Sequence, residues 1–117
     1  MTVINLLPHA IRVDQKGGNN TCWYPPSGEV FRVSTTSTPV GEIDADGIKI
    51  PIMKTKFIPS DLPTPKKDTI YIISSLGLQI LRSQGIKRTD LVAPDTGATA
   101  IRGDDGRIVA VTQFQTF

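Results

Sequence analysis

The sequence predicts an α+β domain, in which a mostly antiparallel or mixed sheet of short strands carries one main helix. Most of the chain consists of short apolar runs separated by turn residues, and only residues 74–84 place apolar side chains at helical spacing. The 117 residues are enough to build one core. No internal repeat or linker divides them, so we expect a single domain covering residues 1–117.

The helix is expected directly after the most hydrophobic strand of the chain. Residues 69–73 (TIYII) form a continuous apolar, β-branched run, which is typical of a central buried strand. Ser74 or Ser75 can cap the helix that follows, and Gly85 is placed to end it in the left-handed conformation. The predicted apolar face of the helix consists of Leu76, Leu78, Ile80 and Leu81.

Shorter strands are expected on either side of this unit. In the N-terminal third, residues 3–7, 10–13 and 29–33 have the apolar pattern of strands. In the C-terminal third, residues 99–102 and 107–111 flank an Asp-Gly turn and predict a hairpin.

The middle of the chain predicts a second hairpin. An Asp-Gly turn at residues 46–47 is followed by alternating Ile48, Ile50 and Ile52, and Pro51 indicates an edge strand. The proline-rich residues 54–68 predict a surface loop that wraps over the body or contacts a partner.

Composition excludes several classes of protein. A net charge of +2, with the basic residues spread along the chain, argues against a long nucleic-acid partner. The single cysteine, Cys22, cannot form an internal disulfide and is expected to be a buried small residue. No apolar run reaches the ~20 residues that span a bilayer, and no secretory signal is evident, so we expect no membrane partner and a cytoplasmic location.

Catalytic signatures are also missing. His9 is the only histidine, which excludes a paired-histidine site and a histidine-rich metal site, and no G-x-S-x-G motif is present. A carboxylate-based magnesium site would have to use Asp90 and Asp95, for which capping and turn formation are alternative roles. We therefore expect a protein that is not an enzyme and needs no cofactor.

A small anion is the ligand that the sequence favours. Backbone N–H groups at the helix start, beside the hydroxyls of Ser74 and Ser75, can hold phosphate or carboxylate, although serines also cap helices without any ligand. Asp95 and Thr96 lie in a turn that can line the same pocket, while His9 and Arg102 are candidate rim groups. Trp23, Tyr24 or Phe114 can stack on a base or belong to the core.

Five segments of the chain resemble those of small single-domain proteins of phage and prophage type. They are INLLPHAI, PPSGEVFRV, DTIYIISSL, DLVAPDTG and IRGDDGRIVAV, and only residues 35–65 have no counterpart. These proteins have no settled function. A weaker analogy is to phage "sponges", which are oligomers that sequester nucleotide signals of bacterial immunity, such as cyclic nucleotides or ADP-ribose derivatives.

The analogy with sponges favours a non-enzymatic anti-defence protein that binds a nucleotide-like anion as a homo-oligomer, a dimer or larger, in the cytoplasm of an infected or lysogenic bacterial host. The alternative is a phage structural or protein-interaction module without a small-molecule pocket. In that case the proline-rich segment and the edge strand near Pro51 would form the contact surface.

Overall fold

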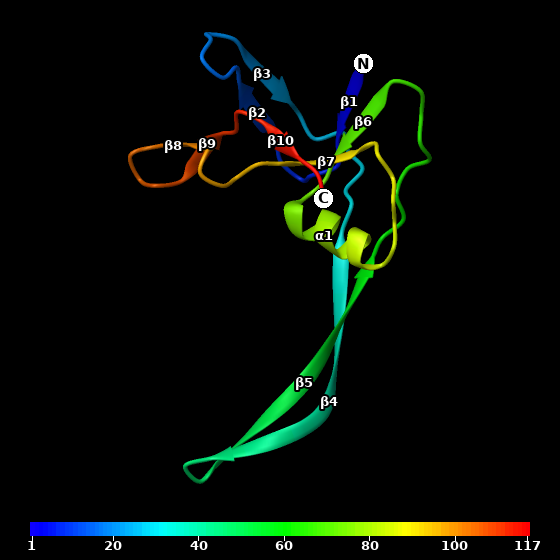
Figure 1. Cartoon of the computed structure of the whole chain (residues 1–117), viewed down its shortest axis with the longest axis vertical. Coiled ribbons are helices and arrows are strands. Elements are labelled where there is room, and N and C mark those ends of the chain that lie inside the picture. Colours follow the sequence, from blue (N-terminus) through cyan, green and yellow to red (C-terminus); the bar gives the residue numbers. More distant parts are fainter.

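A computed structural model describes residues 1–117 and confirms the α+β fold with a single helix (Figure 1). The largest sheet has four strands in the order β1-β6-β7-β10, and β10 is antiparallel to β7 while the other neighbours are parallel. These strands are β1 (Thr2–Asn5), β6 (Thr69–Ile72), β7 (Leu91–Pro94) and β10 (Phe114–Gln115).

Strand β6 lies in the middle of this sheet, as its continuous apolar sequence predicts. Tyr71, Ile72 and Ile73 are at most 1% exposed. Because side chains alternate along a strand, Tyr71 and Ile73 enter the core cluster under the helix, whereas Ile72 enters a second cluster on the opposite face. The sheet is therefore covered on both faces.

Helix α1 (Ser75–Ser83) begins and ends as the sequence predicts. Ser74 is the N-cap, and its hydroxyl accepts a hydrogen bond from the Gly77 N–H at 3.0 Å. Gly85 follows the helix with φ of +84°, a left-handed conformation that suits glycine. One position of the predicted apolar face is wrong: Leu76 is 58% exposed, because the side of the helix that bears it does not face the sheet.

Two small hairpins flank the central sheet. The first joins β2 (Ile11–Asp14) to β3 (Thr21–Tyr24), and the second joins β8 (Ile101–Arg102) to β9 (Ile108–Ala110), as the Asp-Gly turn predicts. The prediction of a buried Cys22 is wrong. Its side chain is exposed, because β3 pairs only with β2 and leaves that side of the strand uncovered.

The most prominent feature is a long hairpin, which we call the arm, formed by β4 (Val33–Ala45) and β5 (Ile48–Pro59) (Figure 1). Its turn is the predicted Asp46-Gly47, with φ of +53° and +82°. The arm projects from the body, and the radius of gyration is 18.1 Å, against roughly 13 Å for a compact domain of this length.

The arm corrects two predictions. Residues 29–32 do not form a strand, since β4 begins at Val33, and residues 54–59 belong to β5 instead of a loop. Strands β4 and β5 pair only with each other, so both have a free edge that tolerates the prolines within them. For this reason Pro39 does not end β4 and Pro51 does not end β5.

Candidate functional site

A cleft of about 360 Å³ lies where five parts of the chain meet: the loop after β1, the start of β2, the start of α1, the end of β7, and β9. It is lined by Leu7, residues 9–12, Ser74, Ser75, Pro94, Thr96 and residues 108–111. Four predicted site residues, His9, Ser74, Ser75 and Thr96, are therefore brought together, although they come from three distant segments of the sequence.

The first turn of the helix has two N–H groups without an acceptor in the chain, and one of them belongs to Ser75, a residue that lines the cleft. Ser74 already satisfies the Gly77 N–H through its hydroxyl and the Leu78 N–H through its carbonyl. The N–H groups of Ser75 and Leu76 donate to no group in the chain. The hydroxyl of Ser75 accepts a hydrogen bond from the Gln115 side chain at 2.8 Å, which fixes its position beside these donors.

The loop that carries His9 is held by Asn5, a residue that the sequence did not single out. Asn5 is 2% exposed, and its amide group donates to the carbonyls of His9 at 2.8 Å and Tyr24 at 2.9 Å. Its side-chain oxygen accepts from the Leu7 N–H at 2.9 Å. Asn5 thus closes a turn whose residues form one wall of the cleft. The only signal of this role in the sequence was that Asn5 is a polar residue inside an apolar run.

Asp95 lies next to the cleft-lining residues but is not one of them. Its carboxylate accepts hydrogen bonds from the Gln113 side chain at 2.7 Å and from the Gly97 N–H at 3.0 Å. These two bonds lower the pKa of Asp95 below its ordinary value. Asp95 therefore stabilises the turn that presents Thr96, and its oxygens are already engaged.

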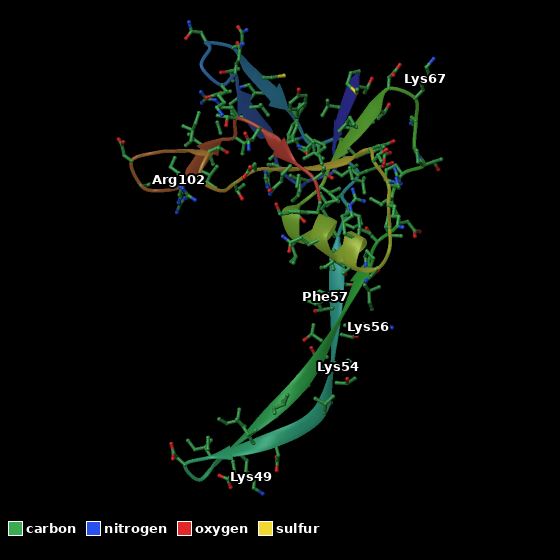
Figure 2. The ribbon with its side chains drawn as sticks, in the orientation of Figure 1. Lys49, Lys54, Lys56, Phe57, Lys67 and Arg102 are labelled. Atoms are coloured by element: carbon green, nitrogen blue, oxygen red, sulfur yellow. The ribbon has the colours of Figure 1, made fainter.

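Arg102 is also outside the cleft. It lies on β8 (Figure 2). Its guanidinium donates to the Gly106 carbonyl at 2.7 Å across the hairpin turn. The apolar residues of the same hairpin, Ile108 and Val109 on β9, line the cleft in its place.

Arg12 is a cationic residue that lines the cleft. Its guanidinium forms two hydrogen bonds with the Asp14 carboxylate, at 2.9 and 3.2 Å, and lies 5.9 Å from the centre of the Trp23 ring. Hydrogen bonds from Arg12 and Thr21 lower the pKa of Asp14. Because Asp14 compensates its charge, Arg12 adds little net positive potential to the cleft.

The aromatic candidates do not line the cleft. Tyr24 and Phe114 pack against the second core cluster with their ring centres 6.2 Å apart, and Trp23 is 59% exposed on the outer hairpin. Apolar contact in the cleft comes from aliphatic residues instead.

No group of three or more histidine, cysteine, aspartate or glutamate side chains is arranged to hold a metal ion, and no helix is long and apolar enough to cross a bilayer. Comparisons with protein-family models, curated proteins and solved structures return no match to this chain.

Proposed function

We propose that the protein binds a small nucleotide-like anion in this cleft and sequesters it without chemical change. The observation that carries this proposal is the convergence of Ser74, Ser75, Thr96 and His9 on one cleft, together with the free backbone N–H of Ser75. A volume of about 360 Å³ lies within the range of small-molecule sites.

The helix start is the proposed contact for a phosphate group. The free N–H groups of Ser75 and Leu76 lie at the positive end of the helix dipole, where an anion is stabilised. Among the lining residues, the hydroxyls of Ser74 and Thr96 are further hydrogen-bonding groups for phosphate oxygens. The anion is therefore recognised mainly by neutral donors, since Arg12 is paired with Asp14.

The aliphatic lining residues are the proposed contact for the uncharged part of the ligand. Leu7, Ile11, Val109 and Val111 line the cleft with aliphatic side chains. Such a wall covers the face of a base or a ribose by apolar contact, which complements a polar group at the helix start.

Sequestration, as opposed to turnover, agrees with the groups present. The ionisable side chains among the lining residues are His9 and Arg12, and Arg12 is already engaged by a carboxylate. Four of the five segments that resemble phage proteins contribute lining residues. We therefore propose an anti-defence sponge that acts as a homo-oligomer in the cytoplasm of the bacterial host.

Ligand-dependent stabilisation tests this proposal. Thermal unfolding is measured with cyclic di- and trinucleotides, ADP-ribose, cyclic ADP-ribose isomers and NAD. A ligand that binds only the folded protein adds about 2.7 kcal/mol of stability at a hundredfold excess over its Kd. The bound compound should be recovered unchanged after heat release. Absence of stabilisation by all of them contradicts the proposal, and a modified product contradicts sequestration.

A matched pair of variants assigns the binding to the helix start. Ser75 is the first helical residue, where proline is tolerated, and Ser74 has the extended conformation (φ −70°, ψ 153°) that a following proline requires. Ser75→Pro removes one free N–H and should abolish most of the ligand effect. Ser75→Ala removes only the hydroxyl, retains the N–H, and should retain most of the effect.

The arm favours a second candidate function, a protein-interaction module. Its large apolar side chains, which include Ile48 at 64% exposed, are uncovered within one chain. The two candidates differ in which variants impair the protein's biological effect. Substitutions in the cleft impair a sponge, whereas an interaction module is impaired by substitutions on the arm alone.

A further inference from the structure

The only arginine or lysine among the cleft-lining residues is paired with a carboxylate of the same strand. Arg12 lines the cleft, and its Nε and Nη2 donate to the two oxygens of Asp14 at 2.9 and 3.2 Å. Asp14 itself does not line the cleft. An arginine beside an anion site ordinarily binds the anion through this same fork of donors. In this protein the fork is engaged by a carboxylate before any ligand arrives.

Further contacts hold this ion pair in place. Thr21 Oγ1 donates to Asp14 Oδ1 at 2.9 Å, and the Asp14 N–H donates to the Val111 carbonyl at 2.9 Å. The Arg12 guanidinium lies 5.9 Å from the centre of the Trp23 ring, and the two residues are opposite each other in the register of β2 and β3. Hydrogen bonds from Arg12 and Thr21 lower the pKa of Asp14, so its carboxylate is ionised at neutral pH.

A second carboxylate belongs to the turn beside the cleft. Asp95 lies in the chain between Pro94 and Thr96, which both line the cleft. Hydrogen bonds from the Gln113 side chain and the Gly97 N–H lower its pKa, so this carboxylate is also ionised at neutral pH. The arginine and the two carboxylates together therefore give the cleft no net positive charge.

Such surroundings discriminate between anions by their charge. The Ser75 N–H and the hydroxyls of Ser74 and Thr96 are neutral groups that can donate to a phosphate with one negative charge. Each further negative charge loses hydration on entering the cleft and gains no cation in return. A phosphodiester carries a single charge on its phosphate, whereas a phosphomonoester carries about −1.5 to −2 at neutral pH, and the two phosphates of a pyrophosphate bring their charges close together.

We infer that Asp14 makes the cleft selective for phosphodiesters and against phosphomonoesters and pyrophosphates. Asp14 acts through Arg12, by neutralising its charge, and is a positioning residue that does not touch the ligand. The inference rests on the proposed function and narrows it. It selects cyclic nucleotides, in which every phosphate is a diester, over ADP-ribose derivatives, which contain a pyrophosphate.

Affinities for matched pairs of compounds test this selectivity. The pairs are cyclic AMP with AMP, and cyclic di-AMP with its linear hydrolysis product, together with the corresponding guanine compounds. Within each pair, hydrolysis converts one diester into a monoester and leaves the bases and the size nearly unchanged. Titration calorimetry at neutral pH and fixed salt should show that the wild-type protein binds a cyclic compound about tenfold or more tighter than its linear partner.

Variants of the ion pair assign the selectivity to Asp14. Asp14→Asn retains an acceptor oxygen but leaves the charge of Arg12 unpaired, so linear compounds should bind about tenfold or more tighter than to wild type. The preference for cyclic compounds should largely disappear, and binding should become more sensitive to salt. Adding Arg12→Gln restores the net charge of the wild type and should restore the preference. Thermal unfolding shows whether each variant is folded.

Asp44→Asn is the matched control. It makes the same chemical change and the same change in net charge on β4, in the outer part of the arm and away from the cleft (Figure 1). The preference for cyclic compounds should therefore equal that of the wild type. Loss of the preference in this variant would show that net charge, and not the pair at the cleft, sets the selectivity.

The outcomes separate this inference from the proposed function. A linear compound or ADP-ribose that binds as tightly as the cyclic compounds, or tighter, overturns the inference and leaves the proposed function intact. A preference that Asp14→Asn leaves unchanged, or a loss of all binding by the folded variant, overturns the role assigned to Asp14. Absence of binding by every cyclic and linear compound and by ADP-ribose overturns the inference and the proposed function together.

Discussion

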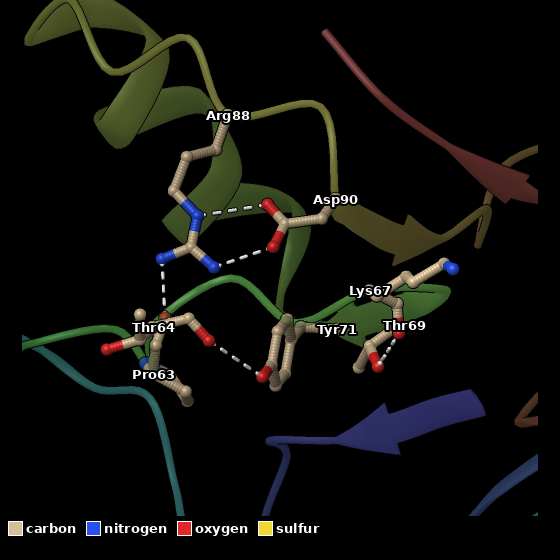
Figure 3. A network of polar contacts seen from close by, with 7 residues as sticks. All are labelled: Pro63, Thr64, Lys67, Thr69, Tyr71, Arg88 and Asp90. Atoms are coloured by element: carbon tan, nitrogen blue, oxygen red, sulfur yellow. Dashed lines mark hydrogen bonds and ion pairs between the residues drawn. The ribbon is translucent and has the colours of Figure 1, made fainter. Parts of the chain in front are cut away.

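Arg88 and Asp90 form a bidentate ion pair, with the guanidinium Nε and Nη2 2.9 and 2.7 Å from the two carboxylate oxygens (Figure 3). The same guanidinium donates to the Pro63 carbonyl at 2.6 Å and lies 5.8 Å from the centre of the Tyr71 ring. The pair thereby fastens the loop before β6 to the segment that enters β7.

We expect Asp90→Ala to lower the free energy of unfolding by about 1–3 kcal/mol, because it leaves a mostly buried guanidinium without its carboxylate. The two side chains are only 20% and 15% exposed. Arg107→Ala is the matched control, since the Arg107–Asp105 pair is 3.7 Å apart and 88% and 63% exposed, and the Asp105 carboxylate keeps its hydrogen bond from the backbone N–H of residue 107. Its effect should be within about 0.5 kcal/mol, as for most exposed pairs. Denaturant unfolding at neutral pH measures both.

The same pair predicts a pH dependence of stability. Hydrogen bonding to Arg88 lowers the pKa of Asp90 in the folded protein. The resulting stabilisation is fully present above the ordinary pKa of about 3.9 and is lost as the pH falls through the lower folded value. The difference in unfolding free energy between wild type and Asp90→Asn should therefore be constant near neutral pH and shrink below about pH 4. A difference that grows with acid would contradict this assignment.

Gly77→Ala should destabilise the protein despite the higher helix propensity of alanine. A methyl group at this position would lie 2.8 Å from Cε2 of Phe31, a ring that is 8% exposed in the core. Alanine gains up to about 1 kcal/mol in a helix, whereas overpacking typically costs about 1–3 kcal/mol. We expect a net loss of about 1 kcal/mol. In the Phe31→Leu background the same substitution should cost less, and equal costs in both backgrounds would exclude the contact as the cause.

Asn5→Ala should cost about 3 kcal/mol, because the carbonyls of His9 and Tyr24 and the N–H of Leu7 lose their partner together. Asn20→Ala removes an exposed amide that bonds only to the Gln15 side chain, so its effect should be small. If Asn5 positions the cleft wall, Asn5→Ala should also weaken ligand binding at a temperature where the protein is folded. Retention of full affinity would limit Asn5 to a role in stability.

The sequence predicted those elements of the fold that depend on interactions between residues close together along the chain. The buried strand β6, the Ser74 cap, the Gly85 terminator and both Asp-Gly hairpins follow from residue type and spacing. Which segments surround the cleft depends on strand order, and the parallel pairing of β1 with β6 and of β6 with β7 is a long-range property. For this reason neither the role of Asn5 nor which of the strand arginines lines the cleft was predicted.

The length of the arm was missed for a different reason. The proline-rich residues 54–68 predicted a surface loop, yet a ribbon with two free edges accommodates a proline such as Pro59 without losing an internal hydrogen bond. Within the cleft, the sequence could not tell that Asp95 is engaged by Gln113 or that Arg102 bonds to its own hairpin turn. Both contacts depend on side-chain geometry that a single sequence does not contain.

Backbone amide chemical shifts, recorded while a ligand from the stabilisation screen is added, test the central claim most directly. If the cleft holds the anion, the signals of Ser75 and Leu76 should move most, followed by those of Thr96 and Val109, while signals from the arm stay unchanged. Binding that leaves the Ser75 and Leu76 signals in place and moves signals elsewhere would contradict the proposed site.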